Sequence, residues 1–457
     1  MTDALPLFVS KMKTAGLDTA VIDTFSHYYR LVVDGETGLL SDRDIDPVQP
    51  EGVENAAGLH AFAEAGERAA GSTVVIILNG GLGTSMGLTK AKSLVQVKDG
   101  RTFLDIKVRQ AENSGARLAF MNSFNTHGDT LQAIADLAPA KTPDFFVQNK
   151  FPKILRSDFT PAHWPKDPRL EWNPPGHGDI YTALLTSGLL AKLIENGIRY
   201  AFISNSDNLG ATLDFSLLGY FSTHNFPFMM EVAERTPADL KGGHLARLKT
   251  GQFVLREIAQ CPKDEIASFE NLHSYRYFNT NNIWVNLSAL KDVFQPSGVI
   301  FLPLILNPKT VDPRDKKSPK VYQIETAMGA AISLFQRAAA VKVDDSRFHP
   351  VKKCNDLLSV RSDCYRLTEE SLLLLSPQRA RPPVVKLDPR YFGHIDAFEK
   401  RFQEGVPSLI ACDSLTIEGD VFFEKNISIK GSVTIKNTRR HPHTIKNGTL
   451  IDRSITI

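Results

Sequence analysis

Short β-rich runs alternate with longer helical stretches from Ser72 onward, and no other feature limits the possible folds of this chain as strongly. Five such runs occupy residues 74–78, 118–121, 145–147, 201–204 and 228–232. Alternation of this kind is typical of α/β domains with a mainly parallel sheet. The sequence therefore predicts an α/β fold.

Four of these runs end in glycine or polar residues, which read LNGG, MNS, VQN and ISNSD in chain order. In open α/β sheets, ligands bind beyond the carboxyl ends of the strands. We therefore expect the four ends to converge on one site. The alternative for any single one is an ordinary turn, since turns need the same residue types.

The first run leads into a glycine-rich stretch, LNGGLGTSMGLTKAK, at residues 78–92. A dinucleotide-binding fingerprint would need glycine where Met86 stands, and Gly87 comes one residue late. A P-loop would need a lysine directly after a glycine, which this stretch lacks. Glycines nevertheless allow close backbone approach to a nucleotide, so we expect a different phosphate-holding loop.

Charge and cysteine content exclude several classes of protein. Lys plus Arg number 53 against 51 Asp plus Glu, without a long run of one sign, so nucleic-acid and membrane-surface binding are not expected. No apolar stretch is long enough to cross a membrane. The cysteines lie too far apart for a disulfide framework or zinc site, at Cys261, Cys354, Cys364 and Cys412. A cytoplasmic protein is expected.

The two ends of the chain have patterns of their own. Residues 1–71 look helical and predict an accessory segment before a catalytic domain at 72–385. In residues 386–457, apolar residues recur every six positions, at Leu415, Val421, Ile427 and Val433, at Ile417, Phe423, Ile429 and Ile435, and at Ile445, Ile451 and Ile457. This period indicates a β-helix, with an antiparallel meander as the alternative. So few coils should dock on the catalytic domain or on another subunit.

Nine motifs in order along the chain carry a resemblance to a known family. They are LNGGLGTSMG, FLDI, MNSFNT, PPGHGDIY, SNSDNLGAT, KGGHL, FNTNNIW, QIETAMGAAI and SRFHPVK. From about Leu78 to the C-terminus, the sequence resembles the eukaryotic-type UTP:glucose-1-phosphate uridylyltransferases. The resemblance implies a Rossmann-like, GT-A-like nucleotidyltransferase domain with a mixed sheet, followed by a short left-handed β-helix.

The resemblance also implies an activity. UTP and glucose 1-phosphate would form UDP-glucose and pyrophosphate by in-line attack on the α-phosphorus, with Mg²⁺ as cofactor and without a protein nucleophile. Positioning and charge neutralisation would then supply the catalysis. A homo-oligomer formed through the β-helix is a further expectation.

The nucleotide-binding residues implied by the resemblance gather at the strand ends. They are Leu78, Asn79, Gly80, Gly81, Lys92, Gln148, Gly176, Asn205, Ser206, Asp207 and Lys352. Gln148 would read uracil, because a carboxamide both donates and accepts hydrogen bonds. Asp207 would be the metal ligand. The family usually has proline where this chain has Ala91, and Lys90 competes with Lys92 for the phosphates.

The sugar-binding residues implied by the resemblance are Gly80, Gly81, His177, Asn205, Gly242, Glu257, Asn279 and Asn281. His177 precedes a predicted helix with Asp179 as N-cap, and would bind the sugar phosphate. The catalytic residues would be Lys92, Asp207 and Lys352. Lys353 departs from the family's usual small polar residue and is the competing lysine there.

Other functions remain as alternatives. A broad-specificity UDP-sugar pyrophosphorylase would share these motifs. The glycine-rich stretch has no arginine after its threonine, which disfavours the N-acetylhexosamine relatives. The missing third glycine argues against a nicotinamide oxidoreductase. Intact Lys92, Asp207 and Lys352 argue against an inactive scaffold.

Overall fold

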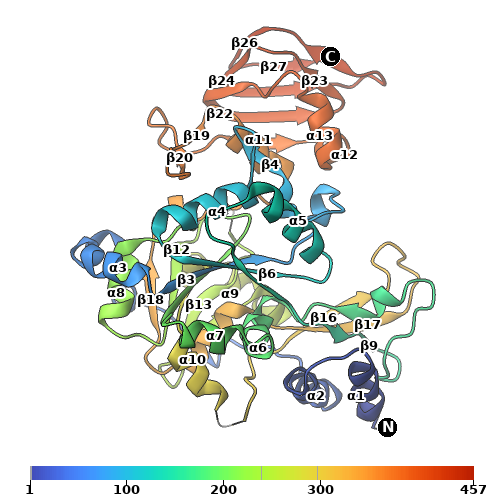
Figure 1. Ribbon diagram of the computed structural model, residues 1–457. Helices are drawn as coiled ribbons and strands as arrows, with labels where there is room; N and C mark the ends of the chain where they lie inside the picture. Colours follow the sequence, from blue (N-terminus) through green and yellow to red (C-terminus); the bar gives the residue numbers. More distant parts are fainter. Residues whose placement is uncertain (1–2, 238, 296) are drawn as a thin grey trace.

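An 11-stranded mixed sheet forms the centre of the computed structural model, which describes residues 3–237, 239–295 and 297–457 (Figure 1). The main path of the sheet runs β2-β18-β12-β15-β11-β3-β6-β7. Its strands are β2 (Glu54–Asn55), β18 (Ala339–Lys342), β12 (Phe228–Glu234), β15 (Tyr277–Asn286), β11 (Tyr200–Asn205), β3 (Thr73–Asn79), β6 (Arg117–Asn122) and β7 (Asp144–Val147). Strand β13 (His244–Leu248) pairs with β15, and β14 (Phe253–Arg256) and β1 (Ile45–Pro47) pair with β13.

All five predicted strands are confirmed, within β3, β6, β7, β11 and β12. The strands β11, β3, β6 and β7 pair in parallel, so their carboxyl ends share one edge. Strand β15 lies antiparallel between β11 and β12 and makes the sheet mixed. The predicted α/β class is therefore confirmed.

Strand β3 is buried on both faces, which explains its continuous apolar run. Val74 and Ile76 face one core, and Val75 and Ile77 face the other. The first core also contains residues of α6 (Ile180–Thr186), α7 (Leu189–Glu195) and α10 (Leu287–Phe294). The second contains residues of α3 (Ala63–Ala70), α4 (Phe103–Ser114), α5 (His127–Leu137) and α8 (Phe215–Thr223).

Helix α4 holds the segment that follows β11. Its N-terminus is fixed by a capping box between Thr102 and Asp105. From the buried side of the helix, Lys107 Nζ donates to the carbonyl oxygen of Ala211 (2.7 Å). Gln110 Nε2 donates to the carbonyl oxygen of Leu209 (3.1 Å). Both contacts lie just after Asp207 in sequence, so α4 supports the loop that carries it.

The N-terminal segment is helical at its two ends but joins the sheet in between. Helices α1 (Leu5–Thr14) and α2 (Thr19–Val33) share a core with Phe151 and Ile154. Strand β1 pairs with β13, and β2 pairs with β18. A helical pattern did not predict these two short strands, because they fall in the proline-containing loop between the helices.

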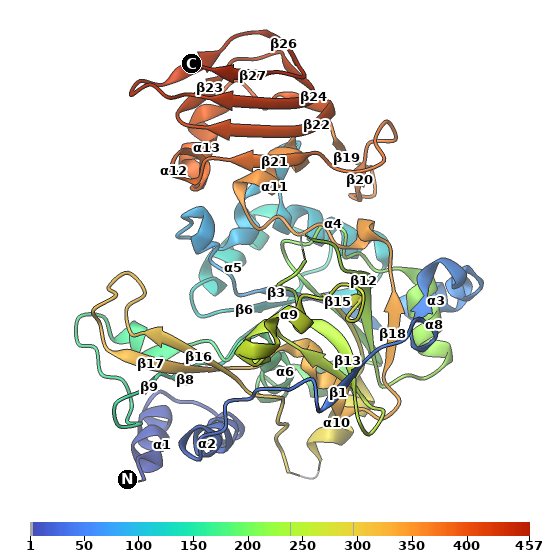
Figure 2. The same cartoon turned by 180° about the vertical axis from the view of Figure 1, so that it is seen from behind.

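A three-stranded sheet extends from the side of the molecule, where both views show it beyond α6 (Figures 1 and 2). It consists of β9 (Ile154–Leu155), β17 (Lys320–Glu325) and β16 (Ile305–Thr310), all antiparallel. Nearby, β8 (Phe151–Pro152) pairs with β10 (Trp172–Asn173). The remaining elements before residue 384 are β4 (Gln96–Lys98), β5 (Arg101–Thr102), α9 (Ile266–Phe269), α11 (Cys354–Arg361), β19 (Tyr365–Leu367) and β20 (Leu373–Leu375).

The C-terminal strands form a block of their own at one end of the molecule (Figure 2). The C-terminal strands follow α12 (Pro389–Phe392) and α13 (Ile395–Arg401) in sequence. They stack in parallel with β21 (Val384–Leu387), which precedes both helices. They are β22 (Ser408–Glu418), β24 (Ile427–Lys436), β26 (Gly448–Ile451) and β27 (Ser454–Thr456), with β23 (Val421–Phe423) paired to β25 (His443–Ile445). Leu415 stands opposite Val433, so two hexad positions pair directly. The antiparallel meander is therefore wrong.

The hexad positions from Leu415 to Ile435 are buried, as predicted. Ile451 was expected to continue the series inward, but 51% of it is exposed. The reason is register: after the interruption, Leu450 pairs with Ile429, so Ile451 faces outward opposite Lys430. A shift of one residue turns a side chain to the other face of a strand.

The C-terminal block shares its apolar core with residues that precede it in the chain. Met86 and Val95 of the glycine-rich region belong to this core, as does Val351 beside Lys352. All four cysteines are buried and unpaired. Within the described ranges, no helix combines the length and hydropathy needed to cross a membrane.

Candidate functional site

The polar strand ends meet at one edge of the sheet, as predicted. Asn79 Nδ2 donates to Asn122 Oδ1 (2.8 Å), which joins the ends of β3 and β6. The backbone amide of Gln148 donates to the backbone carbonyl oxygen of Asn122 (2.7 Å). The backbone amide of Ser206 donates to the backbone carbonyl oxygen of Leu78 (3.2 Å). The ends of β7 and β11 are thereby drawn to the same place.

The glycine-rich loop, residues 80–92, folds back on itself beside these strand ends. The Lys92 amide donates to the carbonyl oxygen of Gly81 (3.1 Å). Gly83 has a φ of +64°, and a Cβ atom there would lie 3.2 Å from Cβ and Cγ of Lys92. The absence of a side chain at Gly83 therefore leaves room for the stem of Lys92.

Lys92 and Asp207 form an ion pair at the centre of the site. Lys92 Nζ lies 2.5 Å from Asp207 Oδ2, and their side chains are 12% and 19% exposed. Lys90 is exposed and makes no ion pair within the described ranges. Of the two competing lysines, Lys92 is therefore the one directed at the strand ends, even without the proline that the family pattern has before it.

Gln148 lies between two of the glycines predicted to accompany it. Its Nε2 donates to the carbonyl oxygen of Gly176 (2.7 Å), and a Cβ atom on Gly80 would lie 3.1 Å from its Oε1. The Asn79 side chain, in contrast, donates to Asn122 and Thr130 and is buried. The Asn79 Nδ2 group therefore fixes the strand ends relative to each other.

His177 is fixed in one tautomer by a backbone contact. Its Nδ1 accepts a hydrogen bond from the Met328 amide (2.9 Å), so Nε2 carries the proton. Burial lowers the pKa of His177 to about 4. The imidazole is therefore neutral near pH 7 and offers one N–H donor.

Asp179 does not cap α6 with its side chain, contrary to the prediction. A 3₁₀ turn, His177–Asp179, precedes the helix. The carboxylate instead accepts from the amide and Nδ2 of Asn149 (2.6 and 3.0 Å). Burial raises the pKa of Asp179 to about 7. The tertiary contact with the segment after β7 prevails over the local cap.

Five of the predicted sugar-binding residues line a pocket of about 470 Å³, namely His177, Gly242, Glu257, Asn279 and Asn281. Gly176 and Lys352 of the predicted nucleotide-binding set also line it, whereas Gly80, Gly81 and Asn205 do not. We call this the sugar pocket. It also contains residues that the sequence did not identify: Asp239, Lys241, Asn307, Glu325 and Phe348. Phe348 lies inside the SRFHPVK motif and Lys241 inside KGGHL, whereas Asn307 carries no comparable signal.

Lys352, and not Lys353, lines the sugar pocket. The amides of both lysines donate to Asp356 Oδ2 (2.8 Å each). The Val351 amide donates to the carbonyl oxygen of Asp207 (3.1 Å), which brings this late segment to the end of β11. Burial raises the pKa of Glu257, and the positive charge of Lys352 opposes that rise.

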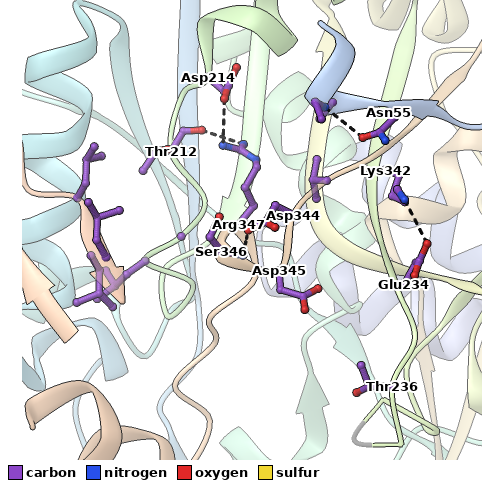
Figure 3. A pocket seen from close by; sticks show the side chains of 18 of the residues that line it. Asn55, Thr212, Asp214, Glu234, Thr236, Lys342, Asp344, Asp345, Ser346 and Arg347 are labelled. Carbon is purple, nitrogen blue, oxygen red and sulfur yellow. Dashed lines mark hydrogen bonds and ion pairs between the residues drawn. The ribbon is translucent and has the colours of Figure 1, made fainter. Parts of the chain in front are cut away.

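A second pocket, of about 770 Å³, lies where the segments after β11 and β18 meet (Figure 3). Arg347 Nη2 donates to the carbonyl oxygen of Thr212 (3.0 Å) and to Glu231 Oε1 (2.7 Å). Arg347 therefore ties the chain leading to Lys352 to the chain after β11. None of the predicted site residues lines this second pocket.

A glycine-rich loop at the ends of parallel strands, a lysine–aspartate pair beside it and an adjoining polar pocket place the chain in the class of α/β proteins that bind ligands at the carboxyl ends of their strands. The family model described as UTP–glucose-1-phosphate uridylyltransferase matches residues 22–430. The chain belongs to this family of nucleotidyltransferases.

Individual relatives agree with the family match. A UTP–glucose-1-phosphate uridylyltransferase of Solanum tuberosum is 42% identical over 79% of this chain and 76% of its own length. A UTP–glucose-1-phosphate uridylyltransferase of Saccharomyces cerevisiae is 40% identical over 89% of this chain and 79% of its own length. A structure of the UDP-glucose pyrophosphorylase from Leishmania major covers 100% of this chain and 100% of its own, with a TM-score of 0.92 and 42% identity.

Proposed function

We propose that this protein joins UTP and glucose 1-phosphate into UDP-glucose and pyrophosphate. The relatives above carry this activity in their names. The observation that carries the proposal is that Lys92, Asp207 and Lys352, far apart in sequence, lie around one set of strand ends and the sugar pocket.

On this proposal, the glycine-rich loop and Gln148 hold the nucleotide. Gln148 lies against both Gly80 and Gly176, which supports a uracil site among the three residues. Leu78, Gly81, Asn205 and Ser206 surround the same strand ends. Lys92 would reach the phosphates from the loop.

Binding of the sugar phosphate is assigned to His177 and the sugar pocket. The Nε2–H of His177 is a neutral donor suited to a phosphate oxygen. Gly242, Glu257, Asn279 and Asn281 would bind the hydroxyls, for which amide and carboxylate groups are suitable partners. Bound in this way, the sugar phosphate would be oriented for attack on the α-phosphorus.

Mg²⁺ is the proposed cofactor, and the donor set fits it. Asp207 offers one carboxylate, and the described residues contain no group of three or more His, Cys, Asp or Glu side chains that could hold a metal ion. Mg²⁺ often keeps one or two carboxylates and takes its other ligands from phosphates and water. Bound at Asp207, it would supply neutralisation of phosphate charge.

In the reaction, a phosphate oxygen of the sugar forms a bond to the α-phosphorus, and the bond to the bridging oxygen of pyrophosphate breaks. Negative charge grows on that leaving oxygen. Lys92 and Lys352 would stabilise it, because fixed charges are most effective where charge develops.

The C-terminal block is proposed to be a short left-handed β-helix that supports assembly. The parallel pairing of β22 with β24 and the buried hexads support the helix. We also keep the division into residues 1–71, 72–385 and 386–457. A cytoplasmic location is consistent with four buried, unpaired cysteines.

Activity across substrates tests the proposed function. Pyrophosphate release is measured with each nucleoside triphosphate and with a panel of sugar 1-phosphates. Preference for UTP with glucose 1-phosphate is expected. Equal turnover of several sugar 1-phosphates would favour the broad-specificity alternative.

A further inference from the structure

A pocket rich in positive charge lies on the side extension, outside the sugar pocket. It measures about 570 Å³ and is lined by the residues on either side of β9, by strands β16 and β17 and by the loop between those two strands. Its cationic residues are Lys153, Arg156, Lys309 and Lys320, and no acidic residue lines it. We call it the basic pocket. A concave wall with one sign of charge concentrates the electrostatic potential and attracts anions.

The charges of the basic pocket have no counter-charge in direct contact. Within the described ranges, none of the four cationic side chains forms a salt bridge. The nearby Asp312 is engaged with Arg314 instead (3.3 Å). The Arg156 guanidinium lies 4.9 Å from the centre of the Tyr322 ring, which leaves its N–H edge available.

Lys153 makes the pocket more than a group of surface lysines. The residue is only 4% exposed, and its Nζ donates one hydrogen bond, to the carbonyl oxygen of Val311 (2.9 Å). An ammonium group has three donors, so two are left for a ligand. Burial lowers the pKa of Lys153, and an anion in the pocket would restore its preference for the charged form.

The basic pocket adjoins the sugar pocket through one strand pair. Asn307 of β16 lines the sugar pocket, and Gln323 of β17 lines the basic pocket. The two residues stand opposite each other in the hairpin register. A ligand held against Gln323 therefore bears on the strand that presents Asn307.

We propose that the basic pocket binds a phosphate group, free or carried on a small organic molecule, separately from the substrates. A compact dianion matches the cluster of ammonium groups and the guanidinium fork of Arg156. We further expect occupancy to change KM for glucose 1-phosphate while kcat stays the same. That second expectation rests on the proposed function, whereas phosphate binding does not.

Calorimetric titration tests the binding. The full chain, first saturated with UDP-glucose to fill the substrate site, is titrated with inorganic phosphate and, in a parallel arm, with glycerol 3-phosphate. Single changes Arg156→Gln, Lys309→Gln and Lys320→Gln should each weaken binding by about fivefold. Lys316→Gln and Lys317→Gln are matched controls, because they remove exposed charges outside the pocket.

The two titrants distinguish the sources of the phosphate. Tighter binding of glycerol 3-phosphate identifies an organic phosphate as the preferred ligand, and equal or weaker binding identifies free phosphate. Affinities that are the same in the three pocket variants, the controls and the unchanged protein overturn the proposal, as does the absence of binding to the unchanged protein. Thermal unfolding of each variant establishes that it is folded.

Discussion

Lys92 Nζ lies 2.5 Å from Asp207 Oδ2, although 115 residues separate the two in sequence. The pair joins the glycine-rich loop to the end of β11. It places the predicted metal ligand against the predicted phosphate-binding lysine. The carboxylate therefore has an internal cation beside it.

We expect Asp207→Asn to lower turnover by about 10²-fold or more and to raise the Mg²⁺ concentration needed for half-maximal rate. A neutral amide is a poorer ligand for Mg²⁺ than a carboxylate. Initial rates over a Mg²⁺ series measure both effects. Asp136→Asn, an exposed change on α5, is the matched control. Wild-type kinetics of Asp207→Asn at every Mg²⁺ concentration would remove Asp207 from the site.

Lys352→Ala should lower kcat by about 10²- to 10³-fold, with a smaller change in UTP affinity. Negative charge grows on the leaving pyrophosphate in the transition state. Loss of the positive charge of Lys352 should therefore lower kcat more than it lowers the affinity for UTP. Lys353→Ala should stay near wild type, since Lys353 does not line the sugar pocket. Lys352→Arg should recover only part of the rate, because a planar fork replaces a compact ammonium. If Lys353→Ala lost activity and Lys352→Ala kept it, the catalytic role assigned to Lys352 would belong to Lys353.

The pH dependence of the free energy of unfolding should reflect the protonation of His177. Burial lowers its pKa from 6.5 to about 4 in the folded protein. Between these values the unfolded chain binds a proton that the folded chain does not, so stability falls as pH drops from 6.5 toward 4. We expect wild type to lose about 2 kcal/mol more unfolding free energy than His177→Gln between pH 7 and pH 5. Identical pH profiles from urea unfolding would contradict the lowered pKa of the imidazole.

Paired isoleucines test the C-terminal block. Ile429 is fully buried and Ile451 is 51% exposed. Ile429→Ala should therefore cost about 2–5 kcal/mol, and Ile451→Ala at most about 0.5 kcal/mol. Thermal or denaturant unfolding measures both. Equal losses would mean that Ile451 does not face outward as the register places it.

Periodicity and strand-end chemistry predicted the parts of the structure that depend on local sequence. Strands β3, β6, β11 and β12 were found because burial on both faces gives continuous apolar runs. Side-chain positions that depend on tertiary contacts could not be predicted from local sequence. Asp179 turns to Asn149 rather than capping its helix, and Leu450 takes the inward position expected for Ile451.

The same distinction between local sequence and tertiary contact applies to the residues of the candidate site. Lys92 and Lys352 could be chosen over their neighbours by motif register, and the geometry directs both toward the site. Asn307 of β16 enters the sugar pocket from a hairpin whose pairing no local pattern specifies. Long-range strand pairing is what the single sequence left open.

The central claim is the transfer of a uridylyl group from UTP to glucose 1-phosphate. Its most direct test is mass-spectrometric detection of UDP-glucose, together with pyrophosphate release, from purified protein supplied with both substrates and Mg²⁺. We predict that the two products appear in equal amounts and that Lys352→Ala lowers the rate of both together. Failure to form UDP-glucose under these conditions, by a protein whose thermal unfolding shows it to be folded, would contradict the proposed function.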